Sequence, residues 1–233
     1  MTRVPIFQVA LLLALVSATV AQAVEVKVLD RGDSGHAAII TVKGFFDFGD
    51  DVRFTYATAG ISKAIVYFES PGGRILPAMN LGFNIWKRGF ETAVAPGTVC
   101  SSACALSWLG GNPRRMGEGA RIGFHSAQHV KDGSSSAVGN EAIGSYIHHK
   151  LGIPREAVIF ATKAMPNDMA WLNAQDAQTY NIHYNALTKA QADRYREALD
   201  RADPVCGRGR LSNAFDPCPQ RVPPQASVLH IDN

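Results

Sequence analysis

Apolar and polar positions along the chain follow two different periodicities. Short apolar runs rich in β-branched residues, AAIITV at 37–42 and AIVYF at 64–68, predict buried strands. Apolar residues at helical spacing between Ile75 and Trp86 predict an amphipathic helix. The same criteria predict further strands at 24–29, 91–95 and 121–124 and further helices at 48–58, 103–109, 140–151, 154–163, 173–180 and 188–201. Because helical crossovers join parallel strands, these strand-helix repeats predict an α/β fold with a mostly parallel sheet.

Glycine, proline and small polar residues mark where the predicted elements end. Gly44 interrupts the apolar pattern that begins at residue 37, and the SPGG sequence at 70–73 is typical of a turn that ends a strand. Proline fixes one backbone dihedral in such a turn, and glycine permits a positive φ. The segment 128–139 contains DGSSS and is predicted to be a loop.

The two ends of the chain differ in composition from the middle. Arg3, the apolar run 9–16 and the tripeptide AQA at 21–23 follow the order of a signal peptide over residues 1–23, with cleavage expected after Ala23. The apolar run is too short to span a bilayer of about 30 Å, so we expect a periplasmic or secreted protein with no membrane span after cleavage. Residues 24–202 then form the folded domain, and residues 203–233 form an irregular, Pro-rich tail.

Charge and cysteine content narrow the class of protein further. The net charge of +3 at pH 7 is small and its lysines and arginines are scattered, which predicts no nucleic-acid partner. Four cysteines in an exported chain indicate two disulfides, and Cys206 with Cys218 would staple the tail. Cys100 and Cys104 lie on either side of two serines, so a bridge there needs a tight turn that brings the two Cα atoms within about 7 Å. Two buried thiols are the alternative for this second pair.

The stretch VCSSACALSWLGG at 99–111 carries the strongest chemical signal. Ser102 lies where strand-like sequence changes to helical sequence, and His125 ends another predicted strand. An acyl-transfer site needs a serine, a histidine that takes its proton, and backbone N–H donors for the oxyanion. Serine is also a preferred helix N-cap, so a purely structural role for Ser101 or Ser102 stands beside the catalytic interpretation.

The order and spacing of three motifs resemble those of the ClpP family of serine peptidases, which have the crotonase-like fold. The matching stretches are AIVYFESPGGRILPAMNLGFNIW, APGTVCSSACALSWLGGNPRRM and ARIGFHSAQ, and WLNAQDAQTYNI is similar to the family's last conserved helix. The resemblance covers roughly Ile40 to Ile182. It implies that Ser102 is the nucleophile, that His125 is the general base, and that the N–H groups of Gly72 and Ala103 form the oxyanion hole.

The resemblance leaves two aspartates as candidates for the acid of a catalytic triad. Asp168, in PNDMAWL, is favoured, although its spacing requires a one-residue insertion, and Asp176 is the alternative. Lys63 and Lys163 are the lysines that invite a Ser–Lys dyad, and neither has the spacing to replace His125.

These observations together predict an exported serine peptidase that acts through an acyl-enzyme on a peptide or protein substrate. We expect no cofactor and no metal, because His125 and His129 have no obvious third ligand. A homo-oligomer remains open. The alternative function keeps the fold without catalysis, as a periplasmic binding or scaffolding module in which Ser102 is only a helix cap. Acyl-thioester chemistry on the same fold ranks last, because export removes the protein from the coenzyme A pool.

Overall fold

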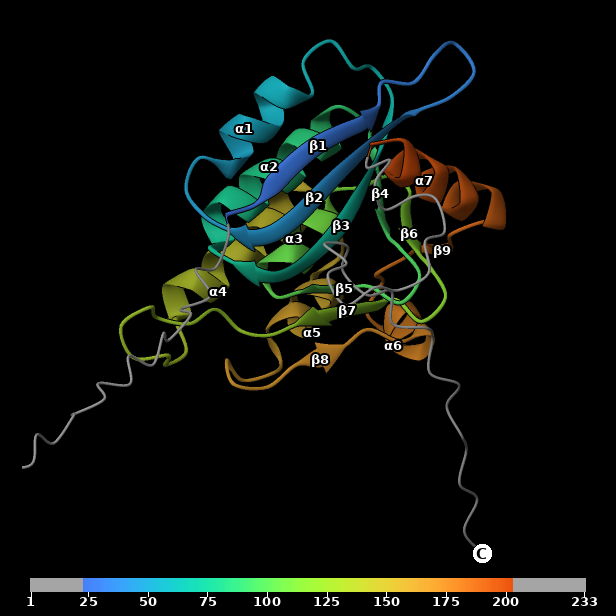
Figure 1. Cartoon of the computed structure of the whole chain (residues 1–233). Coiled ribbons are helices and arrows are strands. Elements are labelled where there is room, and N and C mark those ends of the chain that lie inside the picture. The colour runs from blue at the N-terminus through green and yellow to red at the C-terminus, as the bar shows by residue number, and fades with distance from the viewer. Residues whose placement is uncertain (1–22, 203–233) are drawn as a thin grey trace, which may run out of the picture.

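A mostly parallel β-sheet forms the centre of the structure, and helices pack on both of its faces (Figure 1). The computed structural model describes residues 23–202, so residues 1–22 of the predicted signal peptide, the tail and the predicted Cys206–Cys218 bridge lie outside the described residues. The strands are β1 Glu25–Asp30, β2 Ala38–Phe46, β3 Ala64–Gly73, β4 Glu91–Val94, β5 Val99–Ser101, β6 Arg114–Met116, β7 Arg121–Phe124, β8 Ala170–Trp171 and β9 Asn185–Ala186. The helices are α1 Asp50–Ala57, α2 Ile75–Lys87, α3 Ala103–Leu109, α4 Ala137–Gly144, the π-helical η1 Ser145–Lys150, α5 Arg155–Thr162, α6 Ala174–Thr179 and α7 Lys189–Ala202.

Strand β3 is the branch point of the sheet. Its first half, Ile65–Phe68, pairs in parallel with β4, and further along Ser70 pairs in parallel with Cys100 of β5. One branch continues through β6 to β9 and the other through β7 to β8. The pairs β1–β2 and β7–β8 are antiparallel and the remaining pairs are parallel. This topology confirms the predicted α/β class with a mostly parallel sheet.

Two local predictions at glycines are wrong. The SPGG sequence is not a turn after the strand, because β3 runs to Gly73, and Gly72 and Gly73 pair with Phe45 and Phe46 of β2. Both glycines have a positive φ, of 109° and 137°, so the strand continues in a conformation that only glycine adopts readily. Gly44 likewise does not end β2. It lies at a register shift between Lys43 and Phe45, where a bulge lets the strand continue.

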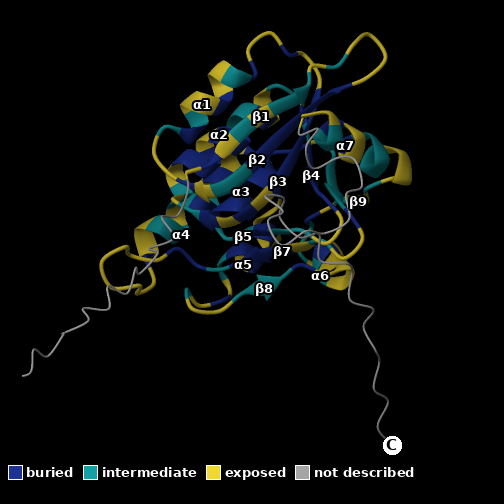
Figure 2. Cartoon of the chain, viewed as in Figure 1, coloured by how far each residue is buried: buried dark blue, intermediate teal, exposed yellow. Residues whose placement is uncertain are grey.

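Alternate side chains of the central strands enter two separate hydrophobic clusters, as period-two geometry requires. Ile40 and Val66 face the larger cluster, which includes buried residues of α2 and α3. Ile39 and Tyr67 face the smaller cluster, which α7 covers with Tyr195 and Ala198. Figure 2 shows the resulting buried centre under exposed helix surfaces. Within residues 23–202, no helix has both the length and the apolar character needed to cross a bilayer.

Candidate active site

The ends of three neighbouring parallel strands bring the predicted site residues to one edge of the sheet. Ser101 pairs with Gly123 across β5 and β7, so Ser102 and His125 each follow directly after one of these strands. The Ser102 N–H donates to the Gly123 carbonyl at 2.8 Å. On the other side of β5, β3 supplies Gly72. The structure therefore places Gly72, Ser102 and His125 on adjacent strand ends.

Ser102 has an unusual backbone conformation for a residue with a side chain. It lies between β5 and α3 with φ 57° and ψ −126°. A non-glycine residue in a sparsely populated region of this kind costs about 1–3 kcal/mol and is concentrated at functional sites. A strained serine on a sharp strand-to-helix turn is the arrangement that projects a nucleophile in α/β hydrolases.

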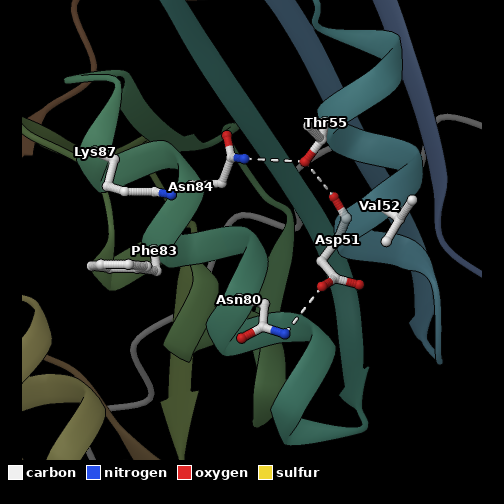
Figure 3. A pocket seen from close by; sticks show the side chains of 7 residues that line it. All are labelled: Asp51, Val52, Thr55, Asn80, Phe83, Asn84 and Lys87. Atoms are coloured by element: carbon white, nitrogen blue, oxygen red, sulfur yellow. Dashed lines mark hydrogen bonds between the residues drawn. The ribbon is translucent and has the colours of Figure 1, made fainter.

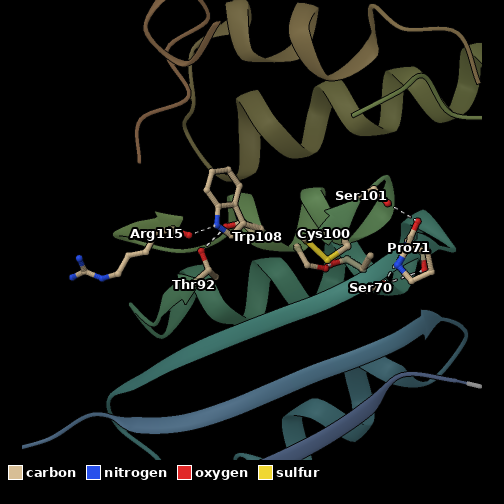
Figure 4. The surroundings of a disulfide bond; sticks show 11 residues. Ser70, Pro71, Thr92, Cys100, Ser101, Trp108 and Arg115 are labelled. Atoms are coloured by element: carbon tan, nitrogen blue, oxygen red, sulfur yellow. Dashed lines mark hydrogen bonds between the residues drawn. A yellow bond between two sulfur atoms is a disulfide. The ribbon is translucent and has the colours of Figure 1, made fainter. Parts of the chain in front are cut away.

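Ser102 occupies the N-cap position of α3, but neither serine of the motif caps the helix with its side chain. The Ser102 side chain makes no capping hydrogen bond, and its half-buried hydroxyl has no hydrogen-bond partner among residues 23–202. The Ser101 hydroxyl instead donates to the Pro71 carbonyl at 3.0 Å, which joins β5 to β3 (Figure 4). The expected capping hydrogen bond of the Ser102 hydroxyl is therefore not formed.

Gly72 packs directly against the serine turn. A Cβ built on Gly72 would lie 2.6 Å from the Ser102 Cβ and 3.1 Å from the Ala103 nitrogen. The 2.6 Å separation is shorter than real Cβ contacts, so position 72 accepts only glycine without rearrangement. The close approach places the two predicted oxyanion-hole residues, Gly72 and Ala103, side by side.

The two predicted oxyanion donors differ in their hydrogen bonding. As the first residue of α3, Ala103 has no intrahelical acceptor for its N–H. The Gly72 N–H, in contrast, donates to the Ser70 hydroxyl at 3.0 Å. Use of Gly72 in an oxyanion hole therefore requires this hydrogen bond to move from the Ser70 hydroxyl to a substrate oxygen.

A disulfide between Cys100 and Cys104 brackets Ser102, which confirms the predicted bridge at this position (Figure 4). It joins β5 to the first turn of α3, with 5.3 Å between the two Cα atoms. Both cysteines are completely buried. The serine turn is thus closed covalently on the side that faces the core.

His125 is half-buried, and its ring Nδ1 lies 2.7 Å from the carbonyl oxygen of Ser126. A carbonyl oxygen only accepts, so Nδ1 carries the proton of the neutral imidazole and Nε2 is left unprotonated. Sequence analysis did not identify Ser126, because a main-chain carbonyl has no sequence signature.

The two aspartates that the resemblance implies lie in other local hydrogen bonds. Asp168 is exposed, and its carboxylate accepts from the Met169 N–H at 2.7 Å. Asp176 accepts from the Asn173 side chain at 2.7 Å. Among the described residues 23–202, neither Asp168 nor Asp176 forms a hydrogen bond with His125.

A surface hollow between α1 and α2 lies apart from these strand ends (Figure 3). Hydrogen bonds from Asn80 to Asp51 and from Asn84 to Thr55 cross it, at 3.0 and 3.1 Å. None of the predicted site residues lines this hollow. Within residues 23–202, no group of three or more His, Cys, Asp or Glu side chains is arranged to hold a metal ion.

Comparison with known proteins yields structural likenesses and no sequence match. No family model matches the chain, and no curated protein sequence matches it. A solved structure of a mutant of the 1510-N membrane-bound stomatin-specific protease is similar, at 16% sequence identity and a TM-score of 0.48. The match covers 68% of this chain and 81% of that chain. The α/β assignment made above rests on the strands and helices of this chain itself.

Proposed function

We propose that the protein is a ClpP-like serine hydrolase, specifically a peptidase, with Ser102 as nucleophile and His125 as general base. The observation that carries this proposal is the conformation of Ser102. Ser102 is strained and packed against Gly72 at a strand-to-helix turn, and its hydroxyl makes no capping bond and has no partner among residues 23–202. Strain of this kind persists where it serves a function.

The reaction proceeds through an acyl-enzyme. The Ser102 oxygen forms a bond to the carbonyl carbon of the scissile peptide, while the hydroxyl proton passes to Nε2 of His125. Collapse of the tetrahedral intermediate breaks the C–N bond, and His125 returns this proton to the leaving amine. Water then attacks the ester with His125 again as base, which releases the acid and restores the serine.

The N–H groups of Ala103 and Gly72 are suited to hold the oxyanion. They adjoin each other beside Ser102, and backbone donors fixed before the reaction stabilise developing charge without reorganisation. The substrate class, a peptide or protein, is supported by the resemblance to the ClpP family in the three quoted motifs. An exported location is supported by the sequence of residues 1–23.

A fluorophosphonate probe tests the proposal on the purified protein. The probe should label Ser102, and Ser102→Ala and His125→Ala should each abolish labelling. The matched control is Ser101→Ala, which should keep the label and lower the free energy of unfolding by about 1 kcal/mol, because it removes the hydrogen bond to Pro71. Ser102→Ala removes no hydrogen bond and should leave the free energy of unfolding within about 0.5 kcal/mol. A folded wild-type protein that the probe does not label at any concentration would overturn the proposal.

A further inference from the structure

The peptide group between Ser126 and Ala127 is held at both of its polar atoms. Its carbonyl oxygen lies 2.7 Å from Nδ1 of His125, and its N–H donates to Oδ1 of Asn140 at 2.7 Å. Asn140 lies in α4, the helix that follows the loop after His125 in the sequence. One peptide group thus links the imidazole to the amide side chain of Asn140.

The surroundings keep this peptide group in place. The Ser126 N–H donates to the Ala164 carbonyl at 2.9 Å, and the Ala127 carbonyl accepts from the Ser136 N–H at 2.8 Å. Ser126 and Ala127 are 4% and 5% exposed. A buried peptide with its neighbouring N–H and carbonyl groups also bonded has little freedom to rotate, so its carbonyl is a fixed acceptor for the imidazole.

The same peptide group gains acceptor strength from its own hydrogen bond. When the N–H of a peptide donates to another group, the carbonyl at its other end becomes a better acceptor, because hydrogen bonds in a chain polarise one another. Asn140 therefore acts on His125 through the Ala127 N–H and the Ser126 carbonyl. In a catalytic triad, a carboxylate does this work of fixing the imidazole tautomer.

We infer that the Ser126–Ala127 peptide, held by Asn140, orients His125 in place of a carboxylate, with Asn140 as a positioning residue. The inference rests on the proposed role of His125 as general base. It is supported by the local hydrogen bonds of Asp168 and Asp176, which direct these carboxylates to Met169 and Asn173. In the neutral imidazole, the arrangement places the proton on Nδ1, so that Nε2 is the atom that accepts the serine proton.

Four variants test this inference through the rate of fluorophosphonate labelling. Asn140→Ala should slow labelling by about 10-fold to 10²-fold, since a misplaced catalytic group has effects of this size. Asn140→Asp keeps an acceptor for the Ala127 N–H and should restore most of the rate. Ser135→Ala is the matched control, because it removes only the 3.4 Å contact to the Asn140 amide nitrogen. Asp168→Asn should label at the wild-type rate, whereas loss of a triad carboxylate lowers the rate about 10⁴-fold.

Nitrogen NMR of the His125 ring separates this inference from the proposed function. The wild-type and Asp168→Asn proteins should both show the Nδ1–H tautomer, and Asn140→Ala should show a mixture of tautomers at the same folded content by circular dichroism. The tautomer measurement needs no catalysis, so it tests the inference even if the probe does not label the wild-type protein. An Nε2–H tautomer in the wild type, or a change of tautomer in Asp168→Asn with none in Asn140→Ala, would overturn the inference.

Discussion

At the scale of single residues, the serine turn combines a costly backbone conformation with contacts that hold it. Ser102 keeps its positive φ while its N–H bonds to Gly123 and its carbonyl accepts from the Ala105 N–H at 3.0 Å. These two hydrogen bonds fix the peptide groups on both sides of the Ser102 Cα. The Ser102 hydroxyl, held on this rigid backbone, has no hydrogen-bond partner in the part of the chain that the structure describes.

Gly72→Ala tests how closely β3 supports this turn. The added methyl group would lie 2.6 Å from the Ser102 Cβ at a φ of 109°, so we expect loss of probe labelling and a drop in the free energy of unfolding of more than about 2 kcal/mol. Labelling kinetics and urea denaturation followed by circular dichroism measure the two effects.

Gly89→Ala is the matched control for this substitution. Gly89 also has a positive φ, of 62°, but a Cβ there meets nothing within 4 Å. The control should lower the free energy of unfolding by only about 1 kcal/mol and leave labelling unchanged. Equal effects of the two substitutions would show that Gly72 matters for its backbone conformation alone and does not support Ser102.

At the scale of elements, helix α3 is anchored at its start and along its length. The disulfide fixes its first turn to β5, and the Ser107 hydroxyl donates to the Ala78 carbonyl of α2 at 2.8 Å. The completely buried Tyr146 hydroxyl of η1 donates to the Leu106 carbonyl at 2.9 Å, and burial raises its pKa, which keeps it a donor. The position of α3 therefore depends on the disulfide chiefly near Ser102, where these other contacts do not reach.

Cys100→Ala combined with Cys104→Ala should loosen the serine turn more than the fold. A cross-link over so short a loop contributes about 2 kcal/mol on chain-entropy grounds, so the variant should remain folded. Labelling of Ser102 should slow, because the residue is free to leave its positive φ. Chemical denaturation and labelling rates check both points. Labelling at the wild-type rate in this double variant would show that the hydrogen bonds alone hold Ser102.

The pattern of apolar residues predicted those elements whose side chains pack on the core. It failed where pairing with a distant strand determines the bounds of an element. The runs at 37–42 and 64–68 became β2 and β3, and the spacing after Ile75 became α2. The three-residue β5 is too short to show any periodicity. The extension of β3 through Gly73 depends on pairing with Phe46, which a local pattern does not contain.

The candidate site likewise has residues that the sequence predicts and contacts that only the structure reveals. Ser102 and His125 could be proposed from the sequence because side-chain chemistry and motif order appear there, and the structure places both at adjacent strand ends. The Asn140 contact joins a helix to a loop through a main-chain group. Neither partner of that contact has a recognisable motif, so only the folded arrangement reveals it.

At the scale of the whole molecule, α7 closes the face of the sheet that lies away from α2 and α3. Tyr195 stacks on Tyr67 with ring centroids 3.9 Å apart, and both side chains lie in the smaller hydrophobic cluster. Next to Tyr195, Arg194 donates to the Ala37 carbonyl at 2.7 Å and to the Asp30 carboxylate at the end of β1 at 3.3 Å. The hydrogen bond from Arg194 to Asp30 thus joins α7, at the end of the described chain, to β1 at its beginning.

The contact between Arg194 and Asp30 should make the free energy of unfolding depend on pH. A hydrogen bond from the Gly32 N–H, together with Arg194 and Arg201, holds the pKa of Asp30 below its ordinary value of 3.8. Because the folded pKa is depressed, the ionised carboxylate stabilises the fold above about pH 4, and this contribution is lost as pH falls through the folded pKa. Asp30→Asn should therefore be less stable than the wild type at pH 7, with a difference that shrinks below pH 4.

Urea denaturation between pH 7 and pH 3 measures this difference in the free energy of unfolding. Arg201→Gln is the matched variant, since it removes a cation 3.6 Å from Asp30 and keeps the Gly32 hydrogen bond that lowers the pKa most. It should retain most of the wild-type pH dependence, and both variants should label at Ser102 normally, because α7 and the serine turn belong to different hydrophobic clusters. A gap between Asp30→Asn and wild type that stays constant down to pH 3 would mean that the Asp30 carboxylate stabilises α7 through packing, with no contribution from its charge.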